Sequence, residues 1–246
     1  MLFLEMLNKV YINLLVVIIN LIDHSIKKKI ISFFKKKFKI SSKLIIFDVG
    51  AHKGETVSLF KKNFSIDKIY SFEPNPKIFK ILEKNTKNFN DVKIFNIGLD
   101  EKNSQKYLNL IFDSSSSSFN DLNDDNNYYK KKKKIFEPFS NKIKKEKILL
   151  ETITLSHIIK KFNINRIDIL KIDTEGYEFN VLKGINFQDF KKIKFIYFEH
   201  HYDLMINKDY KFKDINQLLI KNNYKLQFKI KMKFRKTFEY IYEYKK

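Results

Sequence analysis

The chain has 246 residues, of which 49 are Lys or Arg and 28 are Asp or Glu, so its formal net charge is +21. Hydrophobic residues make up 43% of it, which is enough to bury a sizeable core and excludes the low-hydrophobicity signature of intrinsic disorder. Cysteine is absent, which excludes disulfides, Cys-ligated zinc, iron–sulfur clusters and a cysteine nucleophile.

The positive charge is weak evidence for nucleic-acid binding. The 49 basic residues include only two arginines, Arg166 and Arg235. A protein that reads nucleic acid favours arginine, whose planar guanidinium binds guanine and phosphate through two hydrogen bonds. Abundant lysine beside Asn, Ile, Phe and Tyr is also typical of AT-rich codon usage, which explains the basicity as well as a phosphate-binding role does.

Residues 1–42 are expected to form a helical, basic and amphipathic extension to a domain that spans residues 43–246. Positions 10–22 are apolar, but they hold Asn13 and Asn20 and are fewer than the roughly 20 residues that cross a bilayer. Because no small-residue cleavage site follows, a secretory signal is not expected, and the predicted location is the cytoplasm.

The lysine-rich segment at residues 26–40 has the pattern of a basic amphipathic helix. Its apolar residues fall near one helical face, with lysines on most of the rest. One interpretation is peripheral contact with an anionic membrane surface, at the inner face of the cytoplasmic membrane, through residues 1–40. The alternative is a pair of helices that pack on the domain.

From residue 43 onward, strand and helix patterns alternate. Apolar runs typical of buried parallel strands occur at 44–49, 69–73, 92–97, 167–173 and 193–199, and helical patterns at 55–63, 76–88, 155–162, 178–183 and 215–221. The alternation predicts an α/β fold with a doubly wound parallel sheet, and residues 225–230 and 238–242 predict a terminal antiparallel hairpin.

The alternation is interrupted at about residues 100–147. This stretch holds a serine run, an Asn/Asp-rich segment and five consecutive lysines at 130–134. A long irregular segment in a compact domain is usually either a functional lid or disordered, and both interpretations stay open. We expect a mobile insertion here, with order resuming at 148–154.

The chemistry is expected where the parallel strands end, because open α/β sheets bind ligands at that edge. Residues 48–54 read D-V-G-A-H-K-G, without the G-x-G-x-x-G fingerprint or a Gly-Lys-Ser/Thr phosphate loop. Asp48 would repel phosphate, but it suits a cationic amino group such as that of S-adenosylmethionine. Glu73, at the end of the second strand, can accept both hydroxyls of a ribose. A nucleoside without phosphates fits this edge best.

These motifs together resemble the FkbM-type methyltransferases, S-adenosylmethionine-dependent enzymes of the class I Rossmann-like fold. The resemblance spans about residues 44–201 and is most specific at 167–184, I-D-I-L-K-I-D-T-E-G-Y-E-F-N-V-L-K-G. It implies a mostly parallel seven-stranded sheet with helices on both faces, and S-adenosyl-L-methionine as the cofactor. The resemblance assigns to the cofactor site Asp48, Gly50, Ala51, Gly54, Glu73, Pro74, Asn96 and Gly98.

The resemblance also implies O-methylation of a hydroxyl on a sugar, a surface polysaccharide or a secondary metabolite. An alcohol acceptor needs a general base, and we expect Asp173 and Glu175 to line its pocket, with His201 or His200 as the alternative base. Capping of the following helix is the structural interpretation for Glu178. Carboxylates here would suit magnesium, but no metal site is expected.

Two other functions stay open. One is a nucleic-acid methyltransferase, for which the ribose 2′-O-methyltransferases of RNA are the remaining type. The absent cysteine excludes the usual C5 enzymes, and D-T-E-G replaces the Pro-Pro-aromatic motif of amino-methylating enzymes. The other is a non-catalytic α/β protein that binds a nucleoside or nucleic acid. The expected partner is a small-molecule or glycan acceptor and not a nucleic acid.

Overall fold

The computed structural model describes residues 2–111, 116–121, 123, 125–126, 130–131, 146–203, 205–233 and 235–245. Its main sheet contains β1 (Leu44–Val49), β2 (Ile66–Phe72), β3 (Val92–Phe95), β8 (Ile167–Ile172), β9 (Ile193–His201), β10 (Tyr224–Lys231) and β11 (Thr237–Tyr244). The strand order is β10-β11-β9-β8-β1-β2-β3; β11 runs antiparallel to the other six strands, which are parallel to one another. The predicted doubly wound, mostly parallel seven-stranded sheet is confirmed, as is the terminal hairpin.

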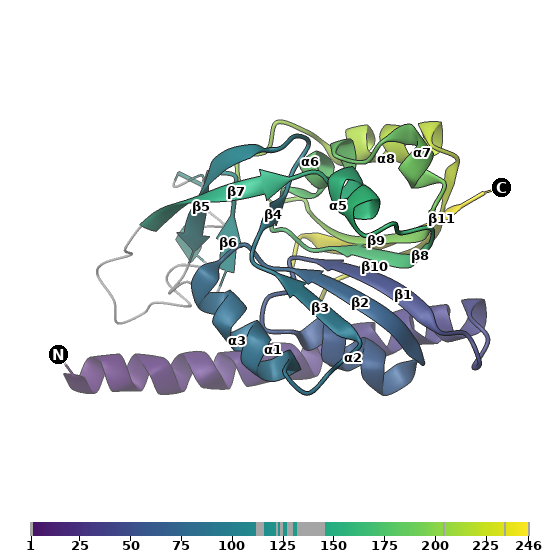
Figure 1. Cartoon of the computed structure of the whole chain (residues 1–246). Helices are drawn as coiled ribbons and strands as arrows, with labels where there is room; N and C mark the ends of the chain where they lie inside the picture. Colours follow the sequence, from purple (N-terminus) through teal and green to yellow (C-terminus); the bar gives the residue numbers. More distant parts are fainter. Residues whose placement is uncertain are drawn as a thin grey trace.

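Helices cover both faces of this sheet (Figure 1). The helices are α1 (Leu2–Lys37), α2 (Glu55–Asn63), α3 (Pro76–Thr86), α5 (Leu155–Lys161), α6 (Glu178–Lys183), α7 (Phe187–Phe190) and α8 (Phe212–Lys221). Side chains of α5–α8 form one apolar cluster with the sheet, and side chains of α1 and α2 form a second on the opposite face. Strand β8 is buried along its whole length, which explains its nearly continuous apolar sequence.

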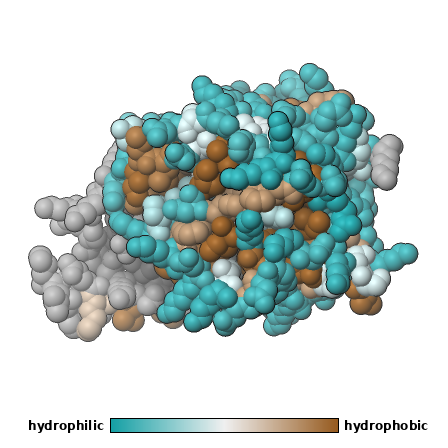
Figure 2. Space-filling model, in the orientation of Figure 1, coloured by the Kyte–Doolittle hydropathy of each residue, from teal (hydrophilic) through white to brown (hydrophobic). Residues whose placement is uncertain are grey.

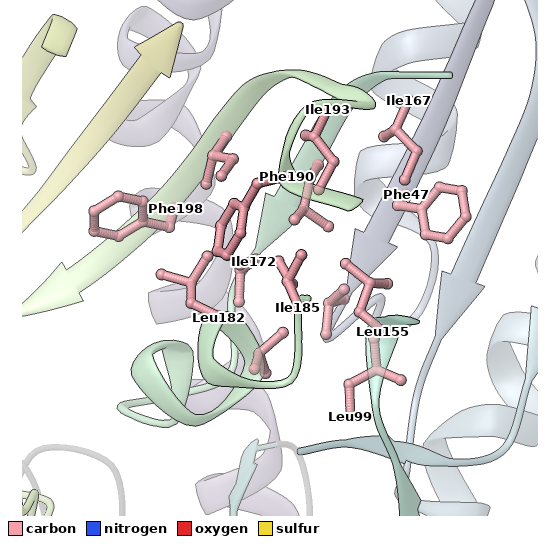
Figure 3. Close-up of a cluster of buried hydrophobic side chains, with 14 of the residues drawn as sticks. Phe47, Leu99, Leu155, Ile167, Ile172, Leu182, Ile185, Phe190, Ile193 and Phe198 are labelled. Carbon is pink, nitrogen blue, oxygen red and sulfur yellow. The ribbon is translucent and has the colours of Figure 1, made fainter. Parts of the chain in front are cut away.

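Figure 3 shows part of the first cluster, where strand and helix side chains interdigitate. Phe47 of β1 and Ile172 of β8 lie on the sheet side, and Leu182 of α6 and Phe190 of α7 lie on the helix side. All four side chains are at most 2% exposed. The packing fixes the carboxyl ends of β1 and β8 relative to each other, and the main cavity lies at that edge.

The N-terminal segment is one continuous helix and not the predicted pair. Ile26, Ile30 and Phe34 of α1 are buried against the sheet, together with side chains of α2. The apolar face predicted at residues 26–40 is therefore covered by protein, and the helix ends at Lys37. Between these positions Lys28 and Lys29 are exposed, as in an ordinary amphipathic helix on a sheet, whereas Lys27 is partly buried.

A second sheet lies where an irregular insertion was predicted. It contains β4 (Gly98–Leu99), β5 (Ser104–Ile111), β6 (Ser116–Ser118) and β7 (Glu146–Ile153), in the order β4-β7-β5-β6. The prediction missed β5 because its eight residues hold only two buried leucines, Leu108 and Leu110, among polar ones. Much of the Asn/Asp-rich and lysine-rich sequence lies outside the described residues.

Hydrophilic residues cover most of the face in Figure 2 and surround a hydrophobic region near its centre. Where the structure describes the chain, no helix is long and apolar enough to cross a membrane.

An ion pair ties α1 to the connection between β10 and β11. Arg235 Nη2 lies 2.7 Å from Asp23 Oδ2, and these side chains are 31% and 10% exposed. Arg235→Ala is expected to destabilise the protein by about 1–3 kcal/mol, because it leaves a nearly buried carboxylate without its cation. Urea unfolding measures this, with the exposed neighbour Lys233→Ala as control. Equal midpoints for both variants would contradict it.

Candidate active site

A cavity of about 480 Å³ opens at the carboxyl ends of the parallel strands. It lies where the strand order reverses between β1 and β8, which is the usual ligand site of such sheets. Its wall includes residues 49–53, Glu73, Pro74, 97–99, 173–175, Glu199 and Glu239, and also Asp23, Ile26 and Lys27 of α1. The volume is in the range of small-molecule sites.

The loop between β1 and α2 brings backbone directly to the cavity. Gly50 has φ +80°, and a Cβ there would lie 1.8 Å from the carbonyl oxygen of Asp173, so only glycine fits. The N–H groups of Gly50 and Ala51 both donate to the carbonyl of Phe72, at 3.0 Å. Gly54 precedes α2 in the left-handed conformation and does not line the cavity.

Glu73 presents a fixed carboxylate on the cavity wall. Its Oε2 accepts the N–H of His52 and its Oε1 the N–H of Asn75, each at 2.9 Å. Burial raises the pKa of Glu73 and these two hydrogen bonds oppose the rise. Each oxygen can accept a further bond, so the carboxylate can receive two neighbouring hydroxyls at once.

Of the other residues predicted to hold the cofactor, some line the cavity and one supports its wall from behind. Pro74 and Gly98 line the cavity, and a Cβ on Gly98 would lie 2.5 Å from the ring of Phe119. Asn96 does not line it, but its side chain donates to the carbonyls of Glu73 and Pro74, at 2.8 and 3.0 Å. Asn96 therefore holds the wall in place from outside.

Asp48 lies behind the loop and not on the cavity wall. It is fully buried, and neither carboxylate oxygen has a hydrogen-bond partner among the described residues. Burial raises its pKa to about 6, and Lys171 opposes the rise with its Nζ 3.9 Å from Asp48 Oδ1. Of the side chains that the structure describes, the nearest cation to Asp48 is thus Lys171, and the loop separates the Asp48 carboxylate from the cavity.

Carboxylates from three elements line the opposite part of the cavity, and we call Asp173, Glu175, Glu199 and Glu239 the acidic cluster. Asp173 and Glu175 follow β8, as predicted from the strand end. Asp173 Oδ2 lies 3.0 Å from Lys171 Nζ. Glu175 has φ +50°, an uncommon conformation for a residue other than glycine.

Comparison with known proteins assigns the chain to a family. Residues 48–226 match the Methyltransferase FkbM domain. The chain belongs to the FkbM methyltransferase family. The match spans both the glycine loop and the acidic cluster up to Glu199, so the predicted resemblance is confirmed.

Individual relatives of this FkbM-family protein are distant. Methyltransferase sdnD of Sordaria araneosa is 27% identical over 177 residues, which are 63% of this chain and 65% of that protein. A crystal structure of methyltransferase FkbM from Methylobacillus flagellatus KT superposes with a TM-score of 0.52 at 15% identity, over 85% of this chain and 46% of that one. The chain thus spans less than two thirds of the length of both.

The fold also extends beyond the family. Magnesium protoporphyrin IX methyltransferase from Synechocystis PCC 6803, with bound S-adenosylmethionine, superposes with a TM-score of 0.52 at 7% identity. The superposition covers 92% of this chain and 82% of that one. At this identity the similarity shows the fold alone.

Burial and mutual repulsion control the charges of the acidic cluster in the FkbM-family protein. Burial, reinforced by Asp173, raises the pKa of Glu199 well above its usual value and that of Glu239 to about 7. Asp173 behaves differently, because the ammonium of Lys171 outweighs its burial and lowers its pKa. The cluster therefore holds an ionised Asp173 beside Glu239, which is about half protonated at neutral pH.

His201 is placed behind the acidic cluster and does not line the cavity. Its Nε2 lies 3.2 Å from Glu199 and 3.5 Å from Glu175. Burial disfavours its charge, but a hydrogen bond with Asp203 and the neighbouring carboxylates raise its pKa to about 10. A histidine protonated at pH 7 cannot accept a proton, so this geometry favours a carboxylate over His201 as general base.

The remaining predicted groups have structural partners. Glu178 Oε1 accepts from Thr174 and Gly176 and its Oε2 from Tyr210, which caps the turn after β8. Burial lowers the pKa of His200 to about 3, and its ring packs against aromatic residues away from the cavity wall. No group of three His, Asp or Glu in the described residues is arranged to hold a metal ion.

Sequence reasoning missed Glu239 and the role of Lys171. Glu239 of β11 lies directly opposite Glu199 of β9, and its Oε2 is buried without a hydrogen-bond partner among the described residues. The available signal was the acidic residue Glu239 in a strand, 237–244, that is mostly apolar and aromatic and holds one other carboxylate, Glu243. Its meaning depends on the pairing of β11 with β9, which chain order does not reveal.

Proposed function

We propose that the protein is an S-adenosylmethionine-dependent O-methyltransferase that acts on a hydroxyl of a sugar, a polysaccharide or a related metabolite. The observation that carries this proposal is the fixed carboxylate of Glu73 beside the close-approach loop at Gly50 and Ala51. Family membership supports methyl transfer, and the acidic cluster supports a hydroxylated acceptor.

The residues present fit S-adenosylmethionine. Gly50 leaves the loop backbone bare at the cavity, and Glu73 can accept the two ribose hydroxyls. The donor-free carboxylate of Asp48 would complement the charge of a nearby amino group, and Leu99 and Phe119 would offer apolar contacts to a base. The cofactor would supply an electrophilic methyl group on its sulfonium.

The acidic cluster would orient the acceptor and remove its proton. Carboxylates accept hydrogen bonds from several neighbouring hydroxyls, which suits a polyol better than an aromatic amine. Glu239 has the pKa best matched to accepting a proton near pH 7, whereas Lys171 keeps Asp173 a weak base. We therefore assign Glu239 as the general base and Asp173 as an orienting acceptor.

The first test is calorimetric titration with S-adenosylhomocysteine. Wild type should bind with micromolar affinity, and Glu73→Ala should weaken binding more than tenfold, or about 1.4 kcal/mol. Glu83→Ala, an exposed position on α3, is the matched control. No binding by folded wild type would refute the cofactor, and equal binding by Glu73→Ala would refute the assigned ribose contact.

The acceptor class needs a second measurement. Transfer of a labelled methyl group from S-adenosylmethionine would be followed on neutral sugars, uronic acids, polysaccharides and RNA. Transfer to a saccharide hydroxyl supports the proposal. Transfer to RNA alone, falling steeply with salt, would replace it with ribose methylation.

A further inference from the structure

The N-terminal half of α1 carries exposed apolar side chains. Helix α1 has 36 residues and is about 54 Å long at 1.5 Å per residue. Among its described side chains the first buried one is Asp23, and the N-terminal half runs out beyond the main sheet (Figure 1). Three of the four side chains described there are apolar and exposed, Met6 by 59%, Val10 by 62% and Leu14 by 59%, and the fourth, Tyr11, is partly buried.

These three residues share one side of the helix. They are spaced four apart, which places them along one helical stripe. At 100° per residue, Lys28 and Lys35 fall in the same sector, about 80° wide, on the side opposite the buried Ile30. Both lysines are exposed, so one face of α1 is apolar near its N-terminus and basic further along.

Such a face matches the boundary of an anionic bilayer. The apolar stripe can insert among acyl chains while the lysines meet the headgroups. The net charge of +21 favours the same surface. Crossing the bilayer is not supported, because no described helix is long and apolar enough.

We propose that the protein docks peripherally on an anionic membrane through the face of α1 formed by Met6, Val10, Leu14, Lys28 and Lys35. The proposed membrane contact is therefore not the apolar face at residues 26–40, because that face packs on the sheet. Asp23, Ile26 and Lys27 of the same helix line the cavity. These cavity-lining residues lie on the side of the helix opposite the docking face, so docking places α1 between the bilayer and the cavity.

Vesicle co-sedimentation of the full chain tests this proposal. Wild type should bind vesicles of equimolar phosphatidylcholine and phosphatidylglycerol, and bind less in high salt or on phosphatidylcholine alone. The triple variant Met6→Glu, Val10→Glu and Leu14→Glu should lower the partition coefficient at least tenfold. The matched control is Tyr107→Glu, Ile220→Glu and Leu226→Glu, at apolar positions that are also exposed; it should bind like wild type.

A second variant and a second measurement separate the alternatives. Replacing Lys28 and Lys35 by Gln should weaken binding to the anionic vesicles and remove part of its salt dependence. Equal binding by wild type and the Met6, Val10, Leu14 variant would overturn the proposal. The proposal would also be overturned if wild type did not bind vesicles and sedimented as a dimer, and the Met6, Val10, Leu14 variant sedimented as a monomer. These three residues would then contact a second copy of the chain.

Discussion

Glu239→Gln is expected to lower kcat for methyl transfer by about 10²–10⁴-fold and to leave S-adenosylhomocysteine affinity within twofold. The carboxylate is buried at the cavity wall, and its Oε2 has no hydrogen-bond partner within the described ranges. Glutamine preserves the shape but cannot take the proton of an acceptor hydroxyl. The loss should therefore appear in the chemical step and not in cofactor binding.

The pH dependence of the rate gives a sharper test. Because burial raises the pKa of Glu239 from 4.5 to about 7, wild-type kcat/KM should rise with pH through about 7 as the base ionises. In Glu239→Gln this rise should disappear. If the variant keeps the wild-type rate and the same rise, the base is another member of the acidic cluster, with Glu199 the first to examine.

The same substitution is also expected to change the free energy of unfolding, which can be measured without knowing the acceptor substrate. Since its folded pKa lies above its unfolded value, Glu239 makes the native state less stable as pH rises from 4.5 to about 7. At about 1.4 kcal/mol for each pH unit, this cost reaches at most about 3 kcal/mol. Urea unfolding should show Glu239→Gln more stable than wild type at pH 8 and similar to it at pH 4.

Glu243→Gln on the same strand is the control with the opposite sign. Burial works against its charge, but hydrogen bonds from Lys37 and Lys245 lower the pKa of Glu243. It contributes stability above its unfolded pKa that is lost as pH falls through the folded value. Glu243→Gln should therefore be slightly less stable than wild type at pH 8. Equal changes in both variants would contradict the assigned charges.

Local sequence determined the central strands and helices well. The predicted bounds of β1 and α2 match the structure at both ends, because an apolar run meets Gly50 and a helical pattern follows Gly54. By contrast, β5 and β6 were missed, since a short or largely polar strand carries no strong alternation of apolar and polar residues. Strong hydrophobic periodicity thus predicts strands and helices from the sequence, whereas largely polar strands are missed.

The candidate site was predictable by position but not by side-chain direction. The strand-end rule selected Glu73, Asp173 and Glu175, and all three line the cavity. Asp48 and His201 also stand at strand ends, yet they lie behind the wall. Their orientation depends on neighbours such as Lys171, and contributions from α1 and β11 arise only from tertiary packing.

Lys171→Met is expected to destabilise the protein by about 3–5 kcal/mol at pH 7, because it removes the cation that neighbours the fully buried Asp48 and the partly exposed Asp173. Burial disfavours the charge of Lys171, but Asp173 and Asp48 outweigh it and raise its pKa. Its contribution to stability is therefore complete below its unfolded pKa of 10.5. Asp173, whose pKa is lowered, contributes above its unfolded value of 3.8.

The pair thus stabilises the fold most between about pH 4 and 10, and the deficit of Lys171→Met should shrink toward pH 3, where the carboxylates are protonated. Urea unfolding across this range measures it, with the exposed Lys225→Met as control. Adding Asp173→Asn to Lys171→Met should recover part of the loss, since an amide leaves no unpaired charge at that position. A double variant less stable than Lys171→Met alone would show that Asp173 is held by contacts other than the lysine.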